Sequence, residues 1–197
     1  MIKLLVGILM LCGFGCSAAA MAGQDRGVYI FGAAGQSEKS TITSGNQDAF
    51  SLFLGYQFNS KWALEGGYVD IGATSYSGNI SVGGATGTAN MSTKSNAASL
   101  TAVRTWNVPD NFGNNGFSFL AKFGVAQVRS SANGSATIPT IFSTSPNYSK
   151  KGVTFGLGAR YDVDQNWAIR ADADSYDTGQ SAYGRLPVFS LGLSYKF

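Results

Sequence analysis

Hydrophobic and polar residues alternate along most of the chain beyond its N-terminal segment. The clearest case is residues 151–163, where every second residue is apolar and the intervening positions are mainly Thr, Gly, Arg and Asp. Residues 48–58 follow the same rule, although Phe53 falls on the polar side. A period of two predicts β-strands with one apolar and one polar face. Eight such strands are predicted, at residues 28–34, 48–58, 62–71, 98–106, 117–129, 151–163, 167–176 and 189–197.

The connections between these strands alternate in length. Residues 59–61 and 164–166 are predicted to form tight turns and 107–115 a moderate connection, whereas 72–94 and 130–150 are predicted to be long loops rich in Ser, Gly and Thr. Short turns at one end and long loops at the other are typical of a transmembrane β-barrel.

The alternative fold is a soluble β-sandwich, whose strands also alternate. Its polar faces would need the surface Lys and Glu that keep a domain soluble, but here they hold mainly Gly, Ser and Thr with charges of both signs. In a bilayer, amphipathic strands satisfy their backbone groups only when the sheet closes on itself. The predicted fold class is therefore all-β, an eight-stranded antiparallel transmembrane β-barrel.

Two segments of the chain resemble one another without a gap. Residues 56–65 and 161–170 each contain a strand end, a short turn and a second strand that opens with Trp-Ala. The similarity suggests a repeated hairpin unit, but convergence on the same turn requirements explains it equally well.

The N-terminal segment has the features of an export signal. One positive charge, Lys3, precedes an apolar run that ends at Phe14, and small residues follow up to Ala22. This order is that of a secretory signal peptide cleaved after Ala22, and the run is too short for a transmembrane helix. Lipoprotein processing at Cys12 or Cys16 is the alternative, although the residues before Cys16 lack the expected Leu. The expected division is a signal peptide at residues 1–22 and a barrel domain at residues 23–197.

The predicted inward faces of the strands collect four acidic and four basic residues. The interior of an eight-stranded barrel is just wide enough for side chains to fill it, and desolvated charges must pair. The sequence therefore predicts a salt-bridge network that plugs the lumen, and the alternative is a gate whose pairings change to open a narrow path. The predicted network comprises Glu65, Lys122, Arg160, Asp162, Arg170, Asp172, Asp174 and Lys196.

Few residues suited to catalysis or metal binding are present. The chain has no His, and its two Cys lie at positions 12 and 16, so the commonest acid–base group and metal ligands are absent from the predicted barrel. Asp172 and Asp174 share one strand face, as an acid–base pair would, but among four bases they are more often structural. We expect no enzymatic activity, catalytic residue, metal site or cofactor. The net charge of +3 is too diffuse to indicate nucleic-acid binding.

The end of the chain resembles the C-terminal signature of bacterial outer-membrane proteins. Leu191, Leu193, Tyr195 and the terminal Phe197 alternate as that signature requires. Residues 54–58, 62–68 and 100–102 are similar to segments of the OmpA/OmpX-like family of eight-stranded barrels. The resemblance implies a multi-pass protein of the Gram-negative outer membrane, read at its C-terminus by the barrel-assembly machinery. It also implies interior charges at Glu65, Lys122 and Arg170.

The family that the chain resembles contains structural proteins, adhesins, serum-resistance factors and small porins. We expect a structural and surface-interaction role, with the long loops contacting extracellular or host ligands. The alternative is a narrow porin for ions or small solutes, because small inward residues leave room for water. Those residues are Gly55, Gly67, Gly124, Gly156, Gly158 and Gly192.

The expected partners are outer-membrane lipids, including lipopolysaccharide, and the barrel-assembly machinery. A small closed barrel is expected to be a monomer. Cations at the outer rim would meet lipopolysaccharide phosphates through charge-assisted contacts. These cations are Lys39, Lys94, Arg129, Lys150, Lys151 and Arg185.

Overall fold

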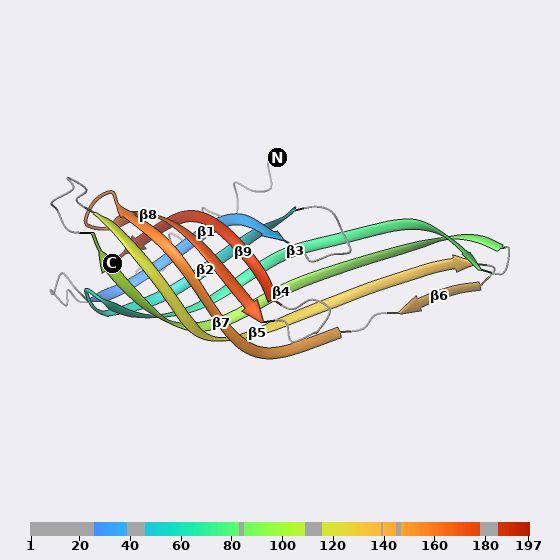
Figure 1. Cartoon of the computed structure of the whole chain (residues 1–197), viewed down its shortest axis with the longest axis horizontal. Helices are drawn as coiled ribbons and strands as arrows, with labels where there is room; N and C mark the ends of the chain where they lie inside the picture. Colours follow the sequence, from blue (N-terminus) through green and yellow to red (C-terminus); the bar gives the residue numbers. More distant parts are fainter. Residues whose placement is uncertain are drawn as a thin grey trace.

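The computed structural model describes residues 26–38, 46–82, 85–108, 116–138, 140–144, 147–177 and 185–197. These residues form a single antiparallel sheet of nine strands (Figure 1). Among them there is no helix long and apolar enough to cross a membrane. The expected signal peptide and Lys39 lie outside the described residues. The strands are β1 (Gly27–Glu38), β2 (Asn46–Asn59), β3 (Trp62–Val82), β4 (Ala85–Asn107), β5 (Phe117–Ile138), β6 (Thr140–Thr144), β7 (Asn147–Asp162), β8 (Trp167–Asp177) and β9 (Arg185–Lys196).

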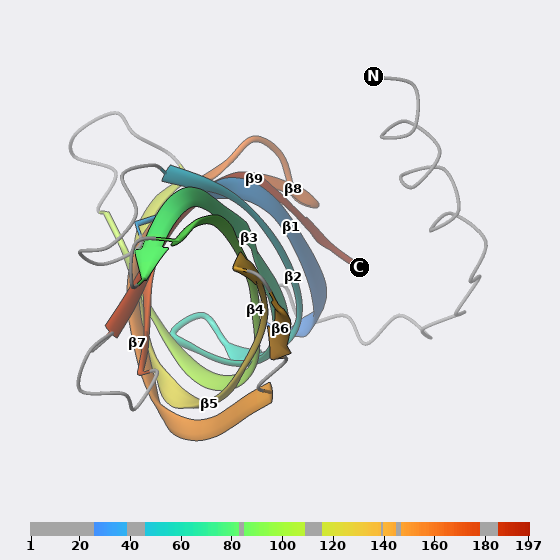
Figure 2. The ribbon, with the colours of Figure 1, turned by 90° about the vertical axis from the view of Figure 1, so that its right-hand side faces the viewer.

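Eight of the strands close into a ring. The sheet runs in the order β4-β3-β2-β1-β9-β8-β7-β5, and pairing of β4 with β5 closes it, as Figure 2 shows along the ring axis. The ninth strand, β6, pairs with β5 far from the ring. The predicted eight-stranded antiparallel barrel is therefore confirmed, with β6 as an addition.

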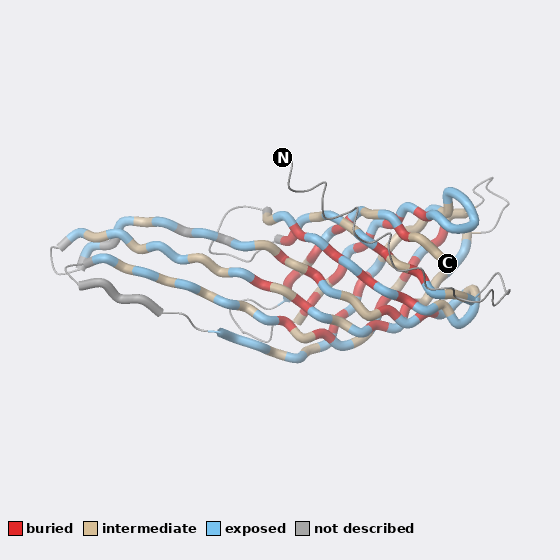
Figure 3. The backbone as a smooth tube through the Cα atoms, turned by 180° about the vertical axis from the view of Figure 1, so that it is seen from behind, coloured by how far each residue is buried: buried red, intermediate tan, exposed pale blue. Residues whose placement is uncertain are grey.

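The two faces of the barrel wall differ as the alternation predicts. On β2 the outward Leu54 is 59% exposed, whereas its neighbour Phe53 is 2% exposed. Buried and exposed residues alternate along the barrel strands (Figure 3). A belt of exposed Leu, Val and aromatic side chains surrounds the barrel. Such a surface is suited to lipid.

The two predicted long loops are wrong, because most of their residues form strands. β3 pairs with β4 from Ala73↔Lys94 to Val82↔Ala85, and β5 continues to Ile138 and pairs back onto β6. We call residues 73–82, 85–94, 131–138 and 140–144 the projecting sheet; it extends well beyond the barrel (Figure 1).

A β-bulge joins the barrel part of β3 to the projecting sheet. The register shifts between Asp70 and Ala73, and Gly72 adopts a φ of 77°, which favours glycine. Beyond the bulge, the strands contain few of the large apolar residues that mark a barrel strand. Their Ser, Thr, Asn and Gly content is instead typical of loops, which explains the incorrect prediction.

The opposite end of the barrel, which we call the turn end, carries tight turns built on one side-chain oxygen each. Asn59 Oδ1 accepts the backbone N–H groups of the second and third residues after it, both at 2.9 Å. Asp164 Oδ1 accepts those of Trp167 at 2.7 Å and Asn166 at 2.8 Å. These two donors, Trp167 first, hold the pKa of the exposed Asp164 carboxyl below its usual value. The two similar segments thus share the same turn chemistry at the aligned residues Asn59 and Asp164.

Candidate functional site

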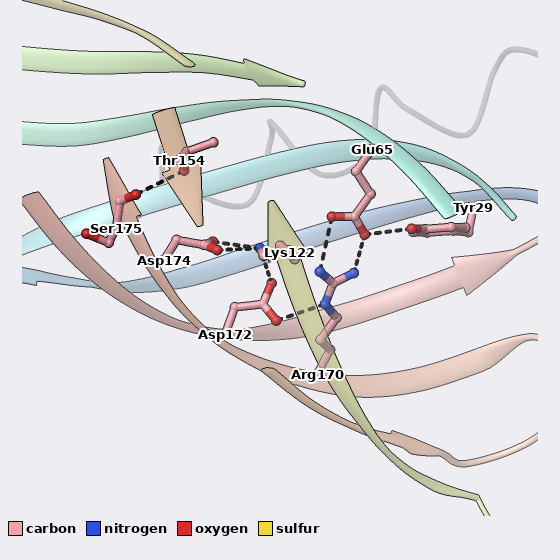
Figure 4. A network of polar contacts seen from close by, with 8 residues as sticks. All are labelled: Tyr29, Glu65, Lys122, Thr154, Arg170, Asp172, Asp174 and Ser175. Carbon is pink, nitrogen blue, oxygen red and sulfur yellow. Dashed lines mark hydrogen bonds and ion pairs between the residues drawn. The ribbon is translucent and has the colours of Figure 1, made fainter. Parts of the chain in front are cut away.

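The lumen contains a buried ion pair between β3 and β8. Glu65 is 0% exposed and Arg170 is 3% exposed. The guanidinium binds both carboxylate oxygens, with Arg170 Nη2 at 3.1 Å from Glu65 Oε2 and Nη1 contacting Oε1. The Tyr29 hydroxyl donates to Glu65 Oε1 at 2.6 Å (Figure 4). Bidentate, charge-assisted geometry of this kind is among the strongest that side chains form.

Lys122 extends the ion pair into a network. Its Nζ, on β5, donates to Asp172 Oδ2 at 2.8 Å and to Asp174 Oδ2 at 2.7 Å, both on β8. Arg170 Nε also donates to Asp172 Oδ1, at 2.9 Å. Asp172 therefore accepts from both bases, whereas Asp174 accepts from Lys122. β3, β5 and β8 are tied together across the lumen (Figure 4).

Two phenylalanine rings pack against the cations of this network. Phe31 and Phe53 stack with their centroids 5.9 Å apart. The Arg170 guanidinium lies 4.5 Å from the Phe31 centroid, and Lys122 Nζ lies 4.8 Å from that of Phe53. Both are cation–π distances. Phe53, the apolar residue on the otherwise polar face of β2, is thus part of the site.

Glycines on the inward face provide the space that these side chains occupy. A Cβ at Gly67 would overlap the Phe53 ring, and one at Gly55 would overlap the Tyr29 ring. On β7, Cβ atoms at Gly156 and Gly158 would overlap the carboxylates of Asp174 and Asp172 respectively. The idea that these four glycines leave room for water is therefore wrong. The space beside each glycine is filled by a side chain of a neighbouring strand.

A cluster of buried apolar side chains lies in the lumen between the charged network and the projecting sheet. We call it the apolar plug, and its residues come from seven of the eight barrel strands. On the turn-end side of the network, by contrast, a cavity of about 10 Å³ touches Tyr29, Gln57 and Arg160. That volume suffices for about one water molecule. The apolar plug consists of Phe31, Ala49, Phe53, Val69, Ile71, Ala97, Ala126, Val128, Tyr176, Leu186 and Val188.

The other predicted charges do not join the ion pairs of this network, although Arg160 lies opposite Arg170 on the neighbouring strand. Arg160 and Asp162 pair with each other, with Nε–Oδ1 at 2.6 Å, and their side chains are 26% and 32% exposed. Lys196 is half-buried at the turn end, where its backbone N–H donates to the Asn166 carbonyl at 2.8 Å. The network in Figure 4 thus joins five of the eight predicted charges. Sequence reasoning missed Tyr29 and Phe31, since the first strand alternates poorly.

The C-terminal residues line the outside of the turn end. Leu191 and Leu193 are more than half exposed on the lipid-facing side. The Tyr195 ring meets Trp167 and Phe197 edge to face, at centroid distances of 4.8 Å and 5.0 Å. An aromatic girdle of this kind is typical of a membrane interface.

The geometry suits the network to holding the wall strands together. Each of its carboxylates contacts at least one cation. The described residues contain no group of three or more His, Cys, Asp or Glu side chains that could hold a metal ion.

Comparison with known proteins identifies the architecture. The profile of the outer membrane protein beta-barrel domain matches residues 8–197. A search of curated proteins finds no match. Among solved structures, Ail of Yersinia pestis in complex with the heparin analogue sucrose octasulfate is 17% identical, with a TM-score of 0.53 over 88% of this chain and 98% of that one. The N-terminal β-barrel domain of Pseudomonas aeruginosa OprF is 17% identical, with a TM-score of 0.52 over 87% and 99%. OprG of Pseudomonas aeruginosa is 16% identical, with a TM-score of 0.50 over 89% and 98%.

Proposed function

We propose, since the chain belongs to the outer membrane protein beta-barrel domain family, that it serves as a structural and surface-contact protein rather than as a pore. Its place is the Gram-negative outer membrane, which it crosses with its strands. In such barrels the short turns face the periplasm and the longer connections face outward. The projecting sheet then stands outside the cell, and this sheet is the observation that carries the proposal.

One edge of the projecting sheet is open within the part of the chain that the structure describes. β2 pairs with β3 only as far as Phe50↔Asp70, whereas β3 continues to Val82 with β4 alone beside it. Residues 73–82 contain no charged residue and no proline. Charges and prolines are the usual means of blocking strand addition, so this edge is suited to pairing with another extended segment.

The partner that this edge fits is an extended polypeptide segment. Backbone N–H and C=O groups supply affinity in strand addition, and side chains supply selectivity. A sulfated polysaccharide fits less well, because residues 73–82, 85–93, 131–138 and 140–144 carry no charge. A heparin-like ligand such as that of the Ail complex requires positive charges opposite its sulfate groups, and these segments have none.

Lysines placed on the open edge are expected to abolish surface contact. In the double variant Ser75→Lys/Ser77→Lys, we expect attachment of expressing cells to cultured epithelial cells to fall about tenfold, since edge charges block strand pairing. The matched control is Asn90→Lys/Ser92→Lys. It puts the same charges at the cross-strand partners on β4, both of whose edges are paired. Equal attachment by both double variants and the unaltered protein would contradict the proposal.

The proposed partners within the membrane are lipids and the barrel-assembly machinery. We propose that the exposed cations Arg129 and Lys151 contact lipopolysaccharide phosphates, whereas Lys94 is paired with Asp70 at 3.3 Å. Recognition of the C-terminal strand by the assembly machinery is proposed on the resemblance of residues 191–197, and a monomeric state on the small closed barrel. A catalytic role is not proposed.

A further inference from the structure

A groove runs along the lipid-facing side of β8. In the half of β8 farther from the turn end, the outward side chains Ala171, Ala173 and Ser175 are small. Larger residues on both neighbouring strands form the walls of the groove. Ala173 pairs with Leu157 of β7 and Phe189 of β9, and Ser175 pairs with Phe155 and Pro187. The groove has a volume of about 190 Å³.

The groove lies in the outward half of the barrel and has a cation at its outer end. Trp167 marks the turn end of β8, so Ala173 and Ser175 lie towards the projecting sheet. The Arg185 guanidinium stacks on Phe155, 4.5 Å from its ring centroid. This stacking holds a positive charge directly above the apolar walls. Asp177, the register partner of Arg185, lies beside it.

An apolar groove in the hydrocarbon layer with a cation at its outer end fits an amphiphile of one kind. Its tail is an acyl chain, because the walls are Phe, Leu and Pro. Its headgroup is anionic, because an arginine fork is suited to phosphate. On β2, by contrast, every outward position from Phe50 to Phe58 is bulky, which leaves no comparable channel.

We propose that the groove over β8 binds one acyl chain of lipopolysaccharide, with Arg185 contacting a lipid A phosphate. The proposal extends the lipid contact suggested for the rim by naming a built site. It is independent of strand addition at the projecting sheet. In the outer leaflet, phosphates lie at the level of the outer rim, where Arg185 is placed.

Native mass spectrometry of the refolded protein released from micelles tests this site, with bisphosphorylated lipid A as the probe. Ala173→Leu fills the groove and is expected to lower lipid A retention about tenfold through loss of apolar contact. Its control is Ala102→Leu, an outward alanine of β4 on another wall. Arg185→Ala is expected to lower the ratio of retained lipid A to retained dephosphorylated lipid A about tenfold. Its control is Arg104→Ala, an outward arginine that stacks on Trp62 at the turn end.

The outcomes separate the two parts of the proposal. Equal retention by the Ala173→Leu and Ala102→Leu variants would overturn the groove. A preference for phosphorylated lipid A that survives Arg185→Ala, or equal retention of phosphatidylglycerol and lipid A by the unaltered protein, would overturn the assignment of the headgroup. Unchanged heat-modifiable mobility on gels verifies that each variant is folded.

Discussion

Replacing Arg170 by Met is expected to destabilise the barrel by about 3–5 kcal/mol, the usual cost of removing one partner of a buried ion pair. Arg170 supplies both cationic contacts of Glu65 and one contact of Asp172. Of the donors to Glu65 among the described residues, its loss leaves the Tyr29 hydroxyl, although the carboxylate is 0% exposed. Reversible urea unfolding in lipid vesicles, followed by tryptophan fluorescence, measures the change.

Two further variants show whether the loss arises from the orphaned carboxylate. In Arg170→Met/Glu65→Gln the buried charge is neutralised, so we expect this double variant to be more stable than Arg170→Met alone. Arg160→Met is the matched control, because Arg160 is also an inward arginine but is 26% exposed and pairs with Asp162 alone. It is expected to cost about 1 kcal/mol or less. A similar loss for Arg160→Met and Arg170→Met would contradict the role assigned to the network.

Replacing Gly67 by Val is expected to destabilise the barrel by about 2–3 kcal/mol, because overpacking forces neighbouring side chains out of position. A Cβ at Gly67 would overlap the Phe53 ring, which is itself held by Phe31 and Lys122. The ring cannot move without losing its stacking partner and its contact with the ammonium group. The same vesicle unfolding assay measures the effect.

A neighbouring glycine provides the control for this variant. Gly66 faces lipid, and a Cβ there would have nothing within 4 Å, so Gly66→Val is expected to change stability by less than about 0.5 kcal/mol. In Gly67→Val/Phe53→Ala the clash is absent, and the combined loss should be smaller than the sum of the single losses. Additive losses would show that Gly67 does not accommodate the Phe53 ring.

The barrel itself could be predicted from the sequence because alternation is strong where one strand face meets lipid. Leu52, Leu54 and Tyr56 on β2 are visible in the sequence as outward residues, and all are about half exposed. The projecting sheet could not be predicted in this way. On the proposed orientation neither of its faces meets lipid, so nothing selects large apolar residues at every second position. Only the structure shows its pairing, for example in the register of β4 with β5, which continues without a break from Thr88↔Thr137 to Asn107↔Ser118.

The site could be predicted in part, for a related reason. Strand parity placed Glu65, Lys122 and Arg170 in the lumen, where they meet. Parity does not say which charges pair: Arg160 is the register partner of Arg170, yet it pairs with Asp162 on its own strand and not with a carboxylate of the network. It also gave no reason for Phe53 to face inward. That reason is three-dimensional, since the ring occupies the space above Gly67 and faces Lys122.

Ion conductance of the refolded protein in planar bilayers tests the central claim that the lumen is closed. On the proposed function, the charged network and the apolar plug block the path in series, and a narrow porin would need both to open. We therefore expect no discrete conductance steps from the unaltered protein, and none from Lys122→Ala, in which the residues of the apolar plug are all retained. Discrete steps from the unaltered protein would contradict the account and favour a narrow porin. Steps that appear only in Lys122→Ala would instead show that the salt bridges act as the gate.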